Sequence, residues 1–198
     1  MPVIAIEGLD GCGKTTVAKL LATRLRCKLV EKPLRWILQE EGQQGLESYW
    51  AVVNRVNEFP DPMCRQWFHC LGWLLIHHRY PDSLVIVDRY VLSNLDYNQN
   101  PRFDQVYQAA LSEIGQPLFT AVLEVTANER RRRITQRDGQ DPGESAEEDA
   151  RRVQRMKDFI KRVGWPHLFV ATDDQTPEQV TARIEDGVAL MLPPAHTR

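Results

Sequence analysis

The sequence predicts an α/β fold in which helices cover both faces of a central parallel sheet, giving three layers. Short apolar runs alternate with longer segments of helical periodicity, which is the pattern of successive βαβ units. The run at 84–87 is unbroken and ends at Asp88, as expected of a strand that is buried on both faces. A glycine-rich segment after the first apolar run marks the carboxyl edge of the sheet, where ligands of such folds gather.

The apolar runs predict strands at residues 2–7, 27–31, 84–87, 119–125 and 167–171. Helical periodicity predicts helices at 14–26, 36–57, 63–78, 102–114, 128–137, 144–163 and 177–191. Two glycines, Gly42 and Gly45, weaken the middle of the helix at 36–57. The helix at 63–78 has the densest set of large apolar residues, so we predict that it is buried. Those residues are Trp67, Phe68, Leu71, Leu74 and Leu75.

Length and composition indicate a single domain over residues 1–192 with a flexible tail at 193–198. The chain has 198 residues, of which 42% are hydrophobic and 26% are charged, close to ordinary globular usage. No apolar run approaches the roughly 20 residues that span a bilayer, and no leader pattern precedes the first strand, so we expect a cytoplasmic protein without membrane contact. The net charge of -2 argues against polymeric nucleic acid as a partner. The four cysteines lack metal-type spacing, so free thiols are expected.

Residues 8–15 match the pattern G-x-x-x-x-G-K-[ST] and lie between a predicted strand and a predicted helix, as that motif requires. Its glycines leave backbone N–H groups open to wrap phosphates at a helix N-terminus. In this interpretation Lys14 reaches the β- and γ-phosphates, and the hydroxyl of Thr15 faces Mg2+. The nucleotide-binding set is Gly8, Asp10, Gly11, Cys12, Gly13, Lys14, Thr15 and Thr16.

GTPase switches, motor-type ATPases and small kinases all share this motif. The guanine-reading Asn-Lys-x-Asp segment is absent from the sequence, and the chain is short for motor machinery. A small kinase with ATP and Mg2+ as its cofactors is therefore favoured. A glycine-rich structural turn is the alternative interpretation of the motif.

Two segments are specific enough to indicate a family. The phosphate loop of thymidylate kinases strongly resembles Glu7-Gly8-Leu9-Asp10-Gly11-Cys12-Gly13-Lys14-Thr15-Thr16. The Asp-Arg-Tyr segment of the same family resembles Val87-Asp88-Arg89-Tyr90-Val91-Leu92-Ser93-Asn94-Leu95-Asp96-Tyr97. With the strand order and the length, the resemblance extends over nearly the whole chain. It implies small-molecule nucleotides as substrates, transfer of the γ-phosphoryl group of ATP to a pyrimidine deoxynucleoside monophosphate, and a homodimer.

The resemblance implies roles for individual residues near the phosphates. Arg89 would grip the 5′-phosphate of the acceptor, a task that suits a planar, permanently charged fork. Asp88 and Thr15 would hold Mg2+, and Asp10 would lie near the acceptor sugar and the metal. A structural ion pair is the alternative role for Arg89.

On the acceptor side, the resemblance implies that Asn94 and Tyr97 face the base and the sugar, with Tyr97 crowding a 2′-hydroxyl. Phe68 and Phe159 resemble aromatic positions near the acceptor base. The alternative roles are a helix cap or packing for Asn94 and Tyr97, and ordinary core packing for Phe159.

Residues 128–149 fall where kinases of this family carry a mobile lid over the donor phosphates. Arg133 and Arg137 lie four residues apart on one helical face, so both can turn toward the transferred phosphoryl group. A solvated helix face is the alternative for these arginines. The complete catalytic set implied by the resemblance is Lys14, Asp10, Asp88, Arg89, Arg133 and Arg137.

The chain departs from the family at the acceptor base. The family's helix before the Asp-Arg-Tyr strand supplies a base-reading arginine, but Gly72 stands near its expected place, and Arg65 and Arg79 only flank the helix. We therefore predict a weaker preference for thymidylate than an ordinary thymidylate kinase has, or a preference for a different pyrimidine-like base, unless Arg65 or Arg79 reaches the base from another turn. Two rivals follow: a kinase of a nucleoside or modified nucleotide in a specialised pathway, and a nucleotide-binding regulator without turnover.

Overall fold

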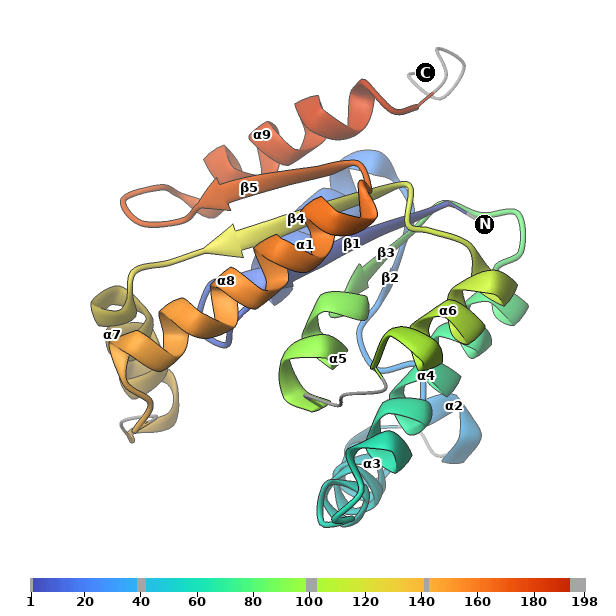
Figure 1. Cartoon of the computed structure of the whole chain (residues 1–198). Coiled ribbons are helices and arrows are strands. Elements are labelled where there is room, and N and C mark those ends of the chain that lie inside the picture. The colour runs from blue at the N-terminus through green and yellow to red at the C-terminus, as the bar shows by residue number, and fades with distance from the viewer. Residues whose placement is uncertain (1, 39–41, 99–102, 141–142, 193–198) are drawn as a thin grey trace.

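The computed structural model describes residues 2–38, 42–98, 103–140 and 143–192 (Figure 1). The tail predicted at 193–198 lies outside the described residues. Five parallel strands form one sheet in the order β2-β3-β1-β4-β5, which confirms the predicted fold class. The strands are β1 (Val3–Gly8), β2 (Lys28–Val30), β3 (Val85–Asp88), β4 (Phe119–Glu124) and β5 (His167–Ala171).

The two faces of the sheet are buried by different helices because strand side chains alternate (Figure 1). On one face, Ile4 and Ile6 pack with α1 (Lys14–Leu25) and α9 (Pro177–Ala189). On the other face, Val3 and Ala5 pack with the second helical layer. That layer consists of α4 (Pro62–Arg79), α5 (Val91–Asn98), α6 (Phe103–Ile114) and α8 (Ala146–Val163). Both layers leave the carboxyl edge of β1 and β3 free to hold the site.

Most helix bounds agree with the sequence prediction to within a few residues, with one interruption. The helix predicted at 36–57 appears as α2 (Arg35–Leu38) and α3 (Gly42–Asn57), and residues 39–41 lie outside the described part. The remaining helix, α7 (Ala127–Asp138), begins at the side-chain cap of Thr126 and ends at Gly139.

The prediction that the helix at 63–78 is buried was wrong for much of its apolar surface. Trp67, Leu71 and Leu74 of α4 are 43%, 40% and 37% exposed. The covered face is instead formed by Gln66, Cys70, Trp73 and Ile76. Helical periodicity identifies an apolar stripe, but it does not say whether another element of the same chain covers that stripe.

The helix α5 was not predicted from the sequence, although it follows the Asp-Arg-Tyr segment directly. It is short and almost entirely buried, so it lacks the amphipathic period that signals a surface helix. Across the described ranges, no helix is both long and apolar enough to cross a membrane.

Candidate active site

The phosphate loop joins β1 to α1 and closes around the side chain of Lys14. Lys14 is only 5% exposed, and its ammonium group donates a hydrogen bond to the carbonyl of Leu9 at 2.6 Å. Gly8 has a positive φ of 134°, and a Cβ there would lie 2.4 Å from the carbonyl oxygen of Leu123. No other residue type fits this turn, so the loop geometry depends on that glycine.

Beside the loop, Thr15 and Asp88 form a pair whose chemistry suits a magnesium ion. The hydroxyl of Thr15 donates to one carboxylate oxygen of Asp88 at 2.5 Å, while the other oxygen is buried without a hydrogen-bond partner among the described residues. Oxygen ligands next to a phosphate-binding loop are what Mg2+ requires, with phosphates and water completing its shell. No cluster of three or more ligating side chains is present in the described part of the chain. The residues therefore fit an ion that is held jointly with the nucleotide.

Asp10 of the phosphate loop contacts two residues of the Asp-Arg-Tyr segment. Its carboxylate forms an ion pair with Arg89 and accepts a hydrogen bond from the hydroxyl of Tyr97 at 2.8 Å. Burial raises the pKa of Asp10, but the charges of Arg89 and Lys14 and the hydrogen bond from Tyr97 outweigh burial, so the net pKa lies below its ordinary value. Asp10 is thus ionised at neutral pH. Arg89 adopts a left-handed backbone, with φ 76°, which aims its side chain across the loop.

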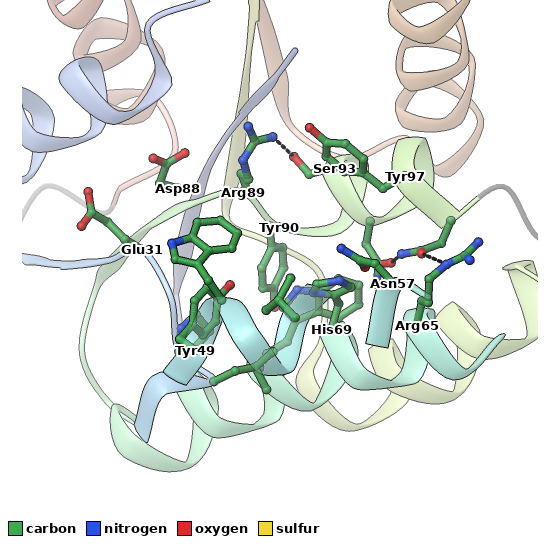
Figure 2. A pocket seen from close by; sticks show the side chains of 18 of the residues that line it. Glu31, Tyr49, Asn57, Arg65, His69, Asp88, Arg89, Tyr90, Ser93 and Tyr97 are labelled. Atoms are coloured by element: carbon green, nitrogen blue, oxygen red, sulfur yellow. Dashed lines mark hydrogen bonds between the residues drawn. The ribbon is translucent and has the colours of Figure 1, made fainter. Parts of the chain in front are cut away.

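A cavity of about 630 Å³ opens next to this pair (Figure 2). Asp10, Asp88 and Arg89 line one end of it. The rest of the lining comes from α3, α4 and α5 and the segment after β2. It includes Glu31, Pro33, Leu34, Tyr49, Trp50, Val53, Asn57, Arg65, His69, Gly72, Trp73, Tyr90, Ser93, Asn94, Tyr97 and Asn98. The volume lies within the range of pockets that hold small molecules.

Two expected acceptor-side aromatics lie elsewhere. Phe159 is 5% exposed and packs in the core, edge-on to Trp165 and Tyr107, and it does not line the cavity. Phe68 is partly exposed on α4 and does not line the cavity, although the ring of the next residue, His69, does. Core packing, the alternative considered for Phe159, describes its place in the structure.

The two expected lid arginines point in different directions. Arg133 bonds to Glu129 and to the hydroxyl and carbonyl of Thr172, so it ties α7 to the end of β5. Arg137 forms an exposed ion pair with Asp138, and its positive charge lowers the pKa of Asp10. Of the two, Arg137 is the one whose charge contributes to the lowered pKa of Asp10.

Sequence reasoning missed Arg130, which is the buried member of the four-arginine run. It is 3% exposed, and its Nε donates to the carbonyl of Asp10 at 2.8 Å. The same guanidinium forms ion pairs with Asp149 and Glu144. Nothing in a run of identical residues shows which one turns inward, but the 3.6-residue period places Arg130 on the same face as Ile134, which is also buried.

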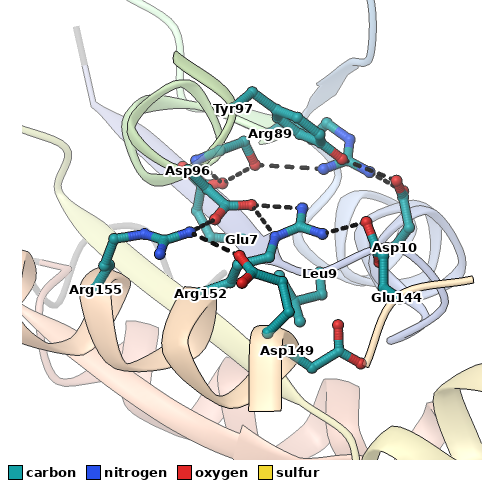
Figure 3. Close-up of polar contacts among 12 residues, drawn as sticks. Glu7, Leu9, Asp10, Arg89, Asp96, Tyr97, Glu144, Asp149, Arg152 and Arg155 are labelled. Carbon is teal, nitrogen blue, oxygen red and sulfur yellow. Dashed lines mark hydrogen bonds and ion pairs between the residues drawn. The ribbon is translucent and has the colours of Figure 1, made fainter. Parts of the chain in front are cut away.

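A second arginine, Arg152 of α8, extends this network to α5 (Figure 3). It forms ion pairs with Asp96 at 2.6 Å and with Glu144 at 2.7 Å, and it lies over the ring of Tyr97. Glu144 therefore bridges Arg130 and Arg152. This network joins the phosphate loop, the segment before α8 and the helix that carries Asn94 and Tyr97.

Glu7 belongs to the segment that resembles the phosphate loop of thymidylate kinases, but the resemblance implied no role for it. Its carboxylate is buried. It accepts hydrogen bonds from the backbone N–H groups of Tyr90, Leu92 and Ser93. Burial raises its pKa, while these hydrogen bonds and the charge of Arg89 act in the opposite direction. Glu7 thus caps the N-terminus of α5, where no side chain of that segment does so.

A base-reading arginine in place of Gly72 would press against Pro33. Gly72 is buried, and a Cβ on it would lie 3.0 Å from Cγ of Pro33. Arg65 does line the cavity, whereas Arg79 stacks over Trp36 and does not. Of the two flanking arginines, only Arg65 lines the cavity.

A loop of backbone N–H groups around a buried lysine, on a parallel sheet of this order, defines the chain as a P-loop nucleotide-binding protein. A family model described as an AAA domain matches residues 3–176, so the chain belongs to that family.

Individual known proteins that resemble the chain give a more specific comparison than the family model does. The chain is 26% identical to a probable thymidylate kinase of Methanococcus aeolicus, over 91% of this chain and 92% of that protein. Probable thymidylate kinases from two strains of Methanococcus maripaludis are each 27% identical, over 68% of this chain and 66% of theirs. The thymidylate kinase structure from Candida albicans matches with a TM-score of 0.67 and 19% identity, covering 96% of this chain and 91% of that one. The chain is thus a thymidylate kinase-like nucleotide kinase, of the ATP-dependent nucleoside monophosphate kinase class.

Proposed function

We propose that this enzyme transfers the γ-phosphoryl group of ATP-Mg2+ to a pyrimidine deoxynucleoside monophosphate and releases the diphosphate. The single observation that carries the proposal is the contact between Asp10 and Arg89, which joins the phosphate loop to the mouth of the cavity. A donor phosphate on the loop and an acceptor phosphate on Arg89 would then meet side by side. Phosphoryl transfer depends mainly on such positioning and on charge neutralisation.

Each participant has a defined task in this proposal. Lys14 and the loop N–H groups bind the donor phosphates, and Thr15 and Asp88 hold Mg2+, which neutralises charge on the phosphoryl group when it is bound. Arg89 holds the acceptor phosphate in place of Asp10 once the acceptor enters. Residues 128–149 act as the lid, in which Arg137 is the arginine whose charge already acts on Asp10.

The test is release of ADP from ATP-Mg2+ with a panel of nucleosides and nucleoside monophosphates, using Lys14→Ala as the inactive control. We expect turnover with deoxypyrimidine monophosphates, little with nucleosides, and a loss of at least about 10²-fold in the variant. Equal turnover with nucleosides would contradict the monophosphate acceptor. Normal turnover by the variant would contradict the role of the phosphate loop.

We further propose that the enzyme works as a homodimer through α4. The exposed residues Cys64, Trp67, Leu71, Leu74 and His78 repeat at intervals of three and four residues and carry no permanent charge. Such spacing forms one seam along a helix, with Leu71 at its middle. Two copies can therefore pack it against itself about a two-fold axis. A cytoplasmic location completes the proposal, because the four free cysteines suit a reducing compartment.

Sedimentation of the wild type and of Leu71→Asp tests this assembly. We expect a dimer for the wild type and a folded monomer for the variant, since two carboxylates would face each other at the centre of the seam. Glu47→Gln, which changes a charge on the exposed side of α3, serves as the control. A monomeric wild type at micromolar concentration would contradict the proposal.

A further inference from the structure

The cavity has a phosphate end and a far end, and the far end is where the base of an acceptor nucleotide would lie. Asp88 and Arg89 line the phosphate end, whereas Asn57, Arg65 and His69 line the opposite side (Figure 2). This assignment of the two ends rests on the proposed function. The polar groups of the far end therefore decide which bases are accepted.

Three polar groups at this end, Arg65, Asn94 and Asn98, are already bonded inside the protein. The Nε of Arg65 donates to Asn98 at 3.2 Å, and its NH1 donates to the carbonyl of Phe59 at 2.9 Å. The amide of Asn98 donates to Asn94, whose own amide donates to the carbonyl of Gln66. Both ends of the Asn94 amide are thus occupied inside the protein, which leaves it little to offer a base.

His69 is different, because its ring nitrogens have no hydrogen-bond partner within the described part of the chain. Its one specific contact is the edge-on ring of Phe68, with ring centroids 5.4 Å apart. Burial lowers the pKa of His69 from 6.5 to about 4, so the imidazole is neutral at physiological pH. A neutral imidazole has one nitrogen that donates a hydrogen bond and one that accepts. Its two tautomers differ in which nitrogen carries the proton. A half-buried polar group without a partner, facing a cavity, points to a hydrogen bond supplied by the ligand.

The surroundings of His69 suit a flat heterocycle. Tyr49, Trp73 and Tyr90 line the same cavity and supply aromatic surface. Gly72, one turn further along α4, supplies no side chain, and Pro33 lies close beside it. The side chains that α4 contributes to the cavity are therefore Arg65, His69 and Trp73.

We propose that His69 reads the acceptor base, and that it accepts both 4-oxo and 4-amino pyrimidines. Toward a 4-oxo base such as thymine, the ring N–H donates to the exocyclic oxygen. Toward a 4-amino base such as cytosine, the bare ring nitrogen accepts from the amino group. An arginine in this place would only donate and would reject the amino group. The substrate class is thus the deoxypyrimidine monophosphates of both kinds.

The test compares kcat/KM for dCMP and dTMP in the wild type and in His69→Arg, His69→Gln and His69→Leu. We expect wild-type values within about 30-fold of each other, and a fall of about 100-fold or more in the dCMP to dTMP ratio for His69→Arg. His69→Gln keeps a donor and an acceptor and should leave the ratio within about threefold. His69→Leu should lower both values by about tenfold or more. Asn54→Arg, on the exposed side of α3, is the control for an added arginine.

A wild-type preference of a thousandfold or more for either base would overturn the proposal. An unchanged ratio in a folded His69→Arg variant would also overturn it, and so would unchanged values for both bases in His69→Leu. If the wild type phosphorylates no monophosphate, the proposed function fails separately. Calorimetric binding of dCMP and dTMP to the same variants then decides the role of His69.

Discussion

The carboxylate of Glu7 accepts two hydrogen bonds from Ser93, one from its backbone N–H at 3.1 Å and one from its hydroxyl at 2.5 Å. Two further backbone N–H groups of the same turn bond to Glu7. A residue at the end of the first strand thereby fixes the start of the helix that carries Asn94 and Tyr97. It also fixes the turn in which Arg89 adopts its left-handed backbone.

The first prediction concerns this cap. In Glu7→Gln an amide group faces backbone N–H donors, so one of those donors loses its partner and the turn must shift. We expect the acceptor KM to rise by about tenfold, while the Kd for ATP changes by less than about threefold. Steady-state kinetics and calorimetry measure the two quantities. Ser93→Ala, which removes only the hydroxyl, should give a smaller change of the same kind.

The second prediction separates the two substrates through Arg89. Arg89→Ala removes the cation that faces the cavity, so kcat/KM for the monophosphate should fall by roughly 10²-fold or more, with little change in ATP affinity. Arg79→Ala is the matched control because that guanidinium stacks on Trp36 outside the cavity. If Arg89→Ala lost ATP affinity but kept wild-type kinetics for the monophosphate, Arg89 would not be the residue that binds the acceptor phosphate.

The third prediction concerns the sugar. If the ring of Tyr97 crowds a 2′-hydroxyl, the wild type prefers deoxynucleotides, and Tyr97→Ala should reduce that preference by about tenfold. Tyr97→Phe keeps the ring and removes the hydrogen bond to Asp10, so it should keep the preference. Competition between a deoxyribonucleotide and its ribonucleotide gives the ratio directly. Equal use of both sugars by the wild type would refute the role.

The fourth prediction concerns stability. Arg130→Ala leaves the buried carboxylate of Asp149 and the carbonyl of Asp10 without this partner, so the free energy of unfolding should fall by about 3 kcal/mol or more. The same change at Arg132, which is 57% exposed and pairs with Glu129 at the surface, should lower the free energy of unfolding much less. Thermal unfolding of both variants measures the difference. Similar losses of stability in the two variants would show that the buried ion-pair network adds little to the free energy of unfolding.

The fifth prediction is a pH dependence caused by His69. Its folded-state pKa of about 4 lies below the unfolded value of 6.5, so between these pH values the unfolded chain binds more protons. The contribution of His69 is therefore fully present above pH 6.5 and is lost as the pH falls toward 4. In chemical denaturation at pH 7 and pH 4.5, His69→Gln should lose roughly 2 kcal/mol less stability than the wild type. Equal losses would mean that His69 does not titrate as expected.

The sequence predicts the layers of this fold and the phosphate loop because both depend on local signals. Strand and helix periods, and glycines at fixed spacing next to a lysine, are visible within a few residues of one another. Burial of α4 was predicted wrongly because a pattern of apolar residues does not reveal what covers them. The helix α5 was missed because its cap, Glu7, lies more than eighty residues earlier in the chain.

The candidate site shows the same limit. Asp10, Arg89 and Tyr97, taken from the family resemblance, lie together in the structure. The buried partners Arg130 and Arg152 were not found, because ion pairs between α5, α7 and α8 join residues that no sequence spacing relates. The cavity role of His69 was also hidden, since the neighbouring Phe68 was the expected aromatic.

The close approach of Pro33 to Gly72 bears on how substrates are assigned to sequences and on how this enzyme would be redesigned. A scheme that infers the nucleobase from an arginine at this position would find none here, where any side chain would have to displace Pro33. An arginine grafted onto position 72 would press its Cβ against Pro33, and a smaller residue at position 33 would relieve that contact. The two positions are therefore best changed together when this cavity is redesigned.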